Sequence, residues 1–136
     1  MLRRMVLAAF SGLLLASASA NASGESVRPP ADAVNFESIE QLKALAAKGP
    51  AILYFHAEWC PTCKAAMVNF RGRWGEVQPG ITLVIADYDR EIELKTTYGV
   101  TYQNSYVQVG SDGEKLQIWN GGGIEALNER PVFAAQ

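Results

Sequence analysis

The sequence predicts an α/β domain in which strands and helices alternate along the chain. Two apolar runs without charge, residues 51–55 and 81–86, have the composition of strands buried on both faces of a parallel sheet. Each run is followed by a segment with helix-forming residues, and right-handed crossovers of this kind bring such strands together. In the last third, two strand-like segments flank Ser111-Asp112-Gly113-Glu114, which predicts a β-hairpin.

The first twenty residues are expected to be a signal peptide. Arg3 and Arg4 precede the apolar stretch 5–15, which is too short to span a bilayer, and Ala18-Ser19-Ala20 has the small residues of a cleavage site. We therefore expect a periplasmic or secreted protein with no stable membrane insertion after cleavage, in a compartment where disulfides persist. An uncleaved membrane anchor is the alternative.

Residues 21–32 are expected to form a flexible linker, because they mix Ser, Gly and Glu with the extended pair Pro29-Pro30. The folded domain is then expected to cover residues 33–136, beginning with a short edge strand at 33–36. A net charge of −2 without a basic block argues against a nucleic-acid partner.

Local signals predict each remaining element in turn. Ser38 with Gln41 three residues later matches a capping box, and it opens a helix that Gly49-Pro50 ends. A second helix follows Pro61 and is expected to break at 71–75. A third is expected at 91–98, ended by Gly99. Strands at 105–109 and 115–119 and a helix at 121–128 complete the chain, and residues 130–136 are expected to trail off.

Two cysteines stand where the first buried strand meets the second helix. Pro61 suits the first helical position, so Cys60 falls at the helix cap, where free N–H groups and the helix dipole favour a thiolate. We therefore expect the pKa of Cys60 to lie below the free-cysteine value of about 8.5. Cys63 lies one turn further along, within disulfide reach of Cys60.

The segment Trp59-Cys60-Pro61-Thr62-Cys63-Lys64, preceded by Phe55-His56-Ala57-Glu58, resembles the active site of the thioredoxin superfamily. Its closest resemblance is to periplasmic thioredoxin-like thiol:disulfide interchange domains. The resemblance implies a thioredoxin-like fold, a central mixed β-sheet flanked by helices on both faces. It also implies that Cys60 attacks a disulfide and that Cys63 resolves the mixed disulfide.

Two positions depart from the family pattern. Thioredoxins carry a buried aspartate six residues before the first cysteine, where this chain has Tyr54, a poor base at neutral pH. The resolving step would then use another route, such as water or Glu58. The cis-proline position is occupied by Asn104, so the Gln103–Asn104 bond is expected to be trans or locally rearranged.

The resemblance gives further residues a role beside the cysteines. Gln103 inherits backbone contacts to a client. Asn104 either bonds a sulfur, helps to hold a metal or cluster that proline normally excludes, or satisfies its own loop. Trp59 is expected to be an exposed platform for a partner, with a core position as the alternative. Pro61 and Thr62 complete the motif. Lys64 either favours the thiolate or is simply solvated, and His56 is either a proton shuttle or metal ligand or a packed side chain.

We expect an exported thiol–disulfide oxidoreductase that reduces envelope proteins, without a cofactor and with a membrane thiol-reductant as its donor. The oxidising direction would follow from a strongly depressed Cys60 pKa. The alternative function is a copper, zinc or cluster carrier that uses Cys60, Cys63 and His56, completed by ligands from a second copy. An inert binding module is disfavoured because both cysteines are present.

Overall fold

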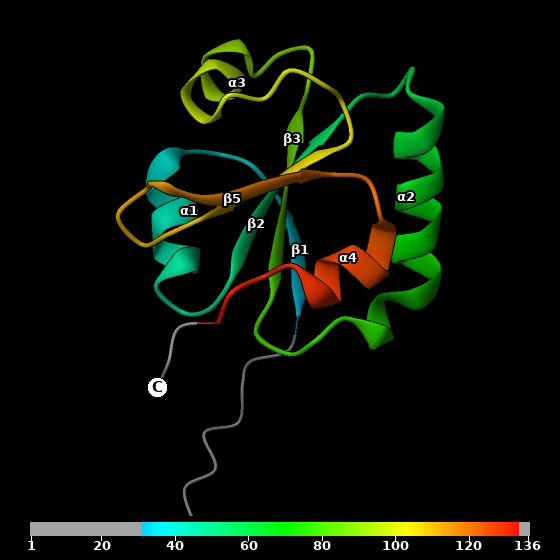
Figure 1. Cartoon of the computed structure of the whole chain (residues 1–136), viewed down its shortest axis with the longest axis horizontal. Coiled ribbons are helices and arrows are strands. Elements are labelled where there is room, and N and C mark those ends of the chain that lie inside the picture. The colour runs from blue at the N-terminus through cyan, green and yellow to red at the C-terminus, as the bar shows by residue number, and fades with distance from the viewer. Residues whose placement is uncertain (1–30, 134–136) are drawn as a thin grey trace, which may run out of the picture.

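The computed structural model describes residues 31–133 and contains a five-stranded mixed sheet with helices on both faces (Figure 1). The expected signal peptide and all but the last two residues of the expected linker lie outside this range. Three strands, β1, β3 and β2, run parallel, and β4 is antiparallel to both β2 and β5. In spatial order the strands are β1 (Asp32–Asn35), β3 (Thr82–Asp87), β2 (Ala51–His56), β4 (Ser105–Val109) and β5 (Lys115–Asn120).

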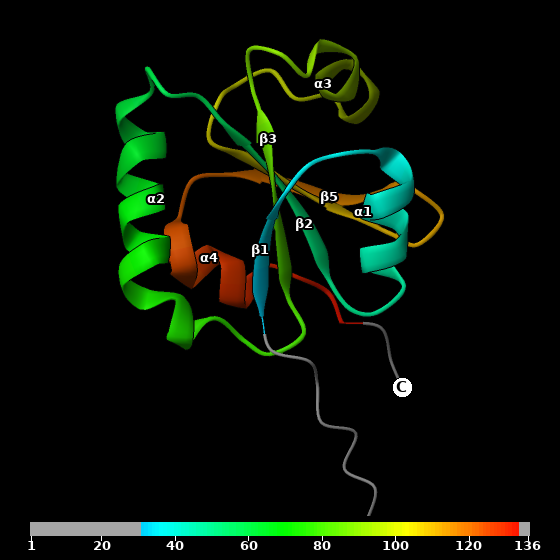
Figure 2. The same cartoon turned by 180° about the vertical axis from the view of Figure 1, so that it is seen from behind.

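The helices divide between the two faces of the sheet, as Figures 1 and 2 show from opposite sides. One face is covered by α1 (Ile39–Ala46) and α3 (Ile92–Tyr98), and the other by α2 (Pro61–Arg73) and α4 (Gly123–Glu129). This arrangement confirms the predicted fold class. None of the helices in residues 31–133 has the length and apolar character needed to cross a membrane.

The start of α1 shows how local chemistry fixes an element. Ser38 Oγ accepts a hydrogen bond from the backbone N–H of Gln41 at 3.1 Å, which confirms the predicted cap. The Gln41 side chain reaches one residue further back than a regular capping box, accepting from the Glu37 N–H at 2.9 Å. The helix therefore begins where the sequence predicts it.

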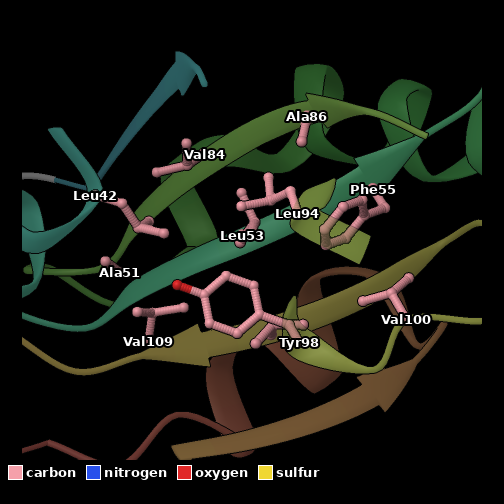
Figure 3. Packing of buried hydrophobic residues seen from close by; sticks show 11 residues of the cluster. Leu42, Ala51, Leu53, Phe55, Val84, Ala86, Leu94, Tyr98, Val100 and Val109 are labelled. Carbon is pink, nitrogen blue, oxygen red and sulfur yellow. The ribbon is translucent and has the colours of Figure 1, made fainter. Parts of the chain in front are cut away.

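Each face of the sheet has its own core, because the strands are buried on both sides. On the α1/α3 face, aliphatic residues dominate, and Figure 3 shows how they converge between the strands and the helices. Its members include Leu42, Leu53, Phe55, Val84, Leu94, Tyr98 and Val107. The α2/α4 face is aromatic: the Tyr106 ring stacks on Tyr54 at 4.6 Å and on Trp119 at 5.4 Å between centroids, and Phe70 meets Tyr54 edge-on at 5.8 Å.

Two sequence predictions about boundaries need correction, one at each end of the described chain. Asp32, assigned to the linker, is the first residue of β1, where its N–H donates to the Ile81 carbonyl at 3.1 Å. The break expected at 71–75 is confirmed: the α-helix ends at Arg73 and tightens into a 3₁₀ turn, Trp74–Glu76. Gly72 is exposed within the helix, where a glycine costs about 1 kcal/mol relative to alanine.

The described part of the C-terminal segment does not trail off. Gln108, a buried residue on β4, accepts a hydrogen bond from the Val132 N–H at 2.8 Å and donates one to the Val132 carbonyl at 2.7 Å. Pro131 beside it is buried. A side chain on the sheet therefore holds residues 130–133 in place, much as a neighbouring strand would.

Candidate active site

The cysteine pair lies at the junction between the end of β2 and the start of α2. This end of the sheet is opposite the end where the described chain begins and finishes (Figures 1 and 2). Cys60 is the N-cap of α2, with an extended backbone (φ −86°, ψ 113°), and Pro61 fills the first turn. The Cys60 carbonyl accepts from the Lys64 N–H at 3.0 Å, which begins the helical ladder. The helix start expected from the sequence is confirmed.

The Cys60 sulfur receives hydrogen bonds from the first turn of α2. The Cys63 N–H donates to Cys60 Sγ at 3.1 Å, and Thr62 Oγ1 lies 3.2 Å from the same sulfur. Burial raises the pKa of the Cys60 thiol, but these contacts with Cys63 and Thr62 outweigh burial and hold the pKa below its ordinary value. A lowered pKa suits Cys60 to act as the nucleophile of the pair.

Cys63 has the opposite character. Both cysteines are free thiols in this structure and both are buried. Burial and the hydrogen bond to the Cys60 sulfur raise the pKa of Cys63, so Cys60 loses its proton more readily than Cys63 does. This difference suits the first sulfur to attack a disulfide and the second to resolve the mixed disulfide.

The sulfurs are buried, and one aromatic side chain, Tyr88, packs against them. Cys60 has 0% relative exposure, and Tyr88 packs against the cluster that it forms with Ala57 and Cys63. The Tyr88 hydroxyl donates to the Thr101 carbonyl at 3.1 Å, and the Lys95 ammonium lies 3.7 Å from the centre of the Tyr88 ring. Cys60 is therefore activated but closed off in the resting structure.

Trp59 is exposed, with 57% of its surface accessible, as the platform hypothesis expects. Its indole Nε1 donates to Asp89 Oδ2 at 2.9 Å, and its ring meets Tyr88 edge-on at 6.4 Å. These contacts fix the ring beside the cysteines rather than leaving it to rotate freely. Its contact with a partner stays a prediction.

The two departures from the family pattern turn out to be bonded to each other. The Tyr54 hydroxyl donates to Asn104 Oδ1 at 3.1 Å, and both residues are buried. No peptide bond within residues 31–133 is cis, and Asn104 takes a left-handed conformation with φ 62°. Its N–H donates to the Phe55 carbonyl at 2.9 Å, and its carbonyl accepts from the Gly121 N–H at 3.0 Å. The predicted local rearrangement is confirmed.

The Gln103 carbonyl, which the resemblance assigns to a client, already has a partner within the chain. Asn120 Nδ2 donates to it at 2.9 Å and also lies 3.2 Å from Ser105 Oγ. Ser105 Oγ in turn donates to the Tyr102 carbonyl at 2.7 Å. One lone pair of the Gln103 carbonyl oxygen is therefore already used within the chain, and a client strand would have to bond to the other. The role of Gln103 in client binding stays a prediction.

Three predicted residues have no side-chain contact with the sulfurs in the described part of the chain. His56 is half-buried at the end of β2 and meets Tyr54 edge-on, with ring centres 6.1 Å apart. Glu58 and Lys64 are exposed. No group of three or more His, Cys, Asp or Glu side chains among residues 31–133 is placed to hold a metal ion, so a carrier would need ligands from elsewhere.

Sequence reasoning missed the partners that surround the motif. Asp89 and Tyr88 follow β3 directly, and β3 is parallel to β2, so their proximity to the cysteines follows from the shared carboxyl edge. That signal was available in the sequence. The Asn120 contact and the Tyr54–Asn104 bond join segments distant in the sequence, and no local pattern predicts them.

Comparisons with known proteins agree with this geometry. The Thioredoxin family model matches residues 32–127. "Thioredoxin-like 3-3" of Oryza sativa subsp. japonica is 31% identical over 94 residues, which are 69% of this chain and 68% of that protein.

Solved structures support the same fold. Thioredoxin NaTrxh from Nicotiana alata superposes with a TM-score of 0.58 at 18% identity, covering 74% of this chain and 90% of its own. Trxlp from Edwardsiella tarda EIB202 gives a TM-score of 0.55 at 16% identity, covering 69% and 91%. The chain therefore belongs to the thioredoxin family, and with its Cys60–Cys63 pair it is a thiol–disulfide oxidoreductase.

Proposed function

We propose that this oxidoreductase is exported and works as a reductant of disulfides in envelope proteins. In the proposed cycle the Cys60 thiolate attacks one sulfur of a client disulfide, giving a mixed disulfide and releasing the first client thiolate. Cys63 then attacks Cys60 Sγ, closes the Cys60–Cys63 disulfide and releases the second client thiolate. A membrane thiol-reductant would return two electrons to the pair.

The observation that carries the reducing direction is that only neutral groups contact the Cys60 sulfur in the described chain. The groups that lower its pKa are the thiol and N–H of Cys63 and the hydroxyl and N–H of Thr62, all of them neutral. Strong oxidants of this chemistry depend on a highly stabilised reduced form. Lys64 is the nearest cation in the sequence, and its side chain is exposed and bonds neither sulfur in the described chain.

The redox potential tests the direction. Reduced and oxidised protein would be equilibrated in a series of thiol–disulfide buffers and followed by Trp59 fluorescence. A potential near about −270 mV, the general thioredoxin value, supports a reductant, and one near about −120 mV reverses the direction. Conversion of Cys60 to Ala gives the control that should show no transition.

Export rests on the N-terminal pattern of two arginines, an apolar stretch and Ala18-Ser19-Ala20. The full chain would be expressed in a bacterial host, fractionated and weighed by mass spectrometry. Mature protein in the periplasmic fraction, lacking residues 1–20, supports export. Full-length protein found only in the cytoplasmic fraction contradicts it.

A further inference from the structure

The resolving cysteine lacks the carboxylate that the family places beside it, and a phenol occupies that position. Tyr54 is fully buried on β2 and faces α2, where its ring packs edge-on against Phe70. Cys63 and Phe70 are both buried residues of α2 and lie seven residues apart, so Tyr54, which packs on Phe70, faces the side of the helix that carries Cys63. Burial and the Cys60 sulfur raise the pKa of the Cys63 thiol, whereas the Ala57 backbone and then the Tyr54 hydroxyl lower it. Tyr54 therefore acts on the sulfur that must become the second nucleophile.

Tyr54 is suited to donate a proton in a hydrogen bond and unsuited to remove one. Burial, the neighbouring Tyr106 and the Cys63 sulfur all raise the pKa of the Tyr54 phenol far above its ordinary value. The raised pKa favours the protonated phenol. A hydroxyl carries a single proton, so it can donate to one acceptor at a time.

In the structure the Tyr54 hydroxyl proton is donated to the side chain of Asn104. The Tyr54 hydroxyl donates to Asn104 Oδ1 at 3.1 Å, and Asn104 is held by backbone hydrogen bonds to Phe55 and Gly121. The other hydroxyl nearby, on Tyr106, is buried without a hydrogen-bond partner among residues 31–133. Besides Cys60, these two phenols are the titratable groups that interact with Cys63.

We propose that the Tyr54 hydroxyl is a hydrogen-bond switch, which donates to Asn104 Oδ1 while Cys63 is a thiol and turns to Cys63 Sγ when that sulfur becomes the attacking thiolate. A charged acceptor forms a hydrogen bond roughly twice as strong as a neutral amide does, so ionisation of Cys63 reverses the preference of the proton. The Cys63 proton leaves to solvent, and the departing client thiolate takes one up. Tyr54 neither gains nor loses a proton.

This inference goes beyond the proposed function, because resolution by Cys63 follows the same steps with any disulfide substrate. The two residues should have opposite effects. Tyr54 stabilises the Cys63 thiolate, so its loss slows resolution. Asn104 competes for the same proton, so its loss speeds resolution, and only when Tyr54 is present. A pair that merely braced the fold would give two losses of the same sign.

The test uses the full chain and an aromatic disulfide, 5,5′-dithiobis(2-nitrobenzoate), in a stopped-flow experiment. Attack by Cys60 releases the first coloured thiolate, and resolution by Cys63 releases the second, so two phases separate the two steps. The variants are Tyr54→Phe, which keeps the ring, and Asn104→Gly, which tolerates the left-handed backbone. The matched control is Tyr98→Phe, which removes a buried phenol bonded to the Gly113 carbonyl at 2.9 Å on the opposite face.

We expect Tyr54→Phe to slow the second phase about tenfold or more while the first phase stays within about twofold. Asn104→Gly should speed the second phase by about threefold, and the double variant should match Tyr54→Phe. Tyr98→Phe should change neither phase. An unchanged second phase in Tyr54→Phe, or a slower one in Asn104→Gly, overturns the switch.

A second measurement keeps the proposal testable if a variant reacts poorly in the first phase. In a Cys60→Ala background, the ultraviolet absorbance of the remaining thiolate gives the pKa of Cys63 directly. We expect Tyr54→Phe to raise that pKa and Asn104→Gly to lower it. A shift of the same sign in both variants contradicts the proposal. None of these outcomes depends on the redox potential or on export.

Discussion

The hydroxyl of Thr62 gives the sharpest test of how the start of α2 activates Cys60. Thr62→Val removes the Oγ1 that lies 3.2 Å from Cys60 Sγ and replaces it with a methyl group. The Cys63 N–H, 3.1 Å from the same sulfur, is untouched because it belongs to the backbone. Thr62 is exposed, so the change opens no cavity. The effect on Cys60 therefore comes from a single donor.

The size of the effect follows from the charge on the acceptor. A hydrogen bond to a charged group contributes about 1.5–3 kcal/mol, and water around Thr62 places this one at the lower end. Because about 1.4 kcal/mol is tenfold in an equilibrium, the thiolate fraction of Cys60 should fall about tenfold at any pH below its pKa. The pKa of Cys60 should rise towards the free-cysteine value.

The assay is the rate of alkylation by iodoacetamide as a function of pH, with the modified cysteine identified by peptide mass spectrometry. Thr97→Val is the matched control, since Thr97 is an exposed threonine of α3 whose hydroxyl donates to the Glu93 carbonyl at 2.9 Å. The control should leave the profile of Cys60 unchanged. If Thr62→Val also leaves it unchanged, the helix terminus alone stabilises the thiolate and the reasoning is refuted.

Three further predictions concern the pair and its support. Below the Cys60 pKa, reduction takes up two protons, so the potential should fall by about 59 mV per pH unit. Above that pKa only Cys63 takes up a proton, so the slope should halve to about 30 mV per pH unit, and the break should lie below the pH at which a free cysteine titrates. Asn104→Pro should destabilise the fold by about 3 kcal/mol or more in urea unfolding, because proline fixes φ near −65° where Asn104 has 62°; equal stability would contradict this. Phe70→Ala should cost about 3–5 kcal/mol in the same assay, since it empties the centre of the aromatic core.

Sequence reasoning predicted the parts of this fold that local chemistry decides. The charge-free runs of β2 and β3, the Ser38 cap and the placement of Cys60 before Pro61 each follow from a few neighbouring residues. The cysteine chemistry was likewise predictable, because a strand-to-helix junction with this spacing has one physical consequence for its first sulfur.

The parts that sequence reasoning did not predict depend on contacts between distant segments. The left-handed conformation of Asn104 is set by bonds to Phe55 on β2 and to Gly121 after β5. The C-terminal segment is held by Gln108, 24 residues before its partner Val132. No propensity at any of these positions indicates where the partner will be, so only the folded chain reveals them.

The closed cover over Cys60 has a consequence for the order of events in catalysis. A sulfur with 0% exposure collides with nothing until Tyr88 or the cysteine itself shifts, so every encounter begins with an opening step. A small oxidant such as peroxide would face the same opening step, so burial should slow overoxidation of this sulfur. Clients that stay bound until Cys60 becomes exposed should react faster than clients that dissociate sooner. The residence time of a client on this face therefore selects among substrates before any bond is broken.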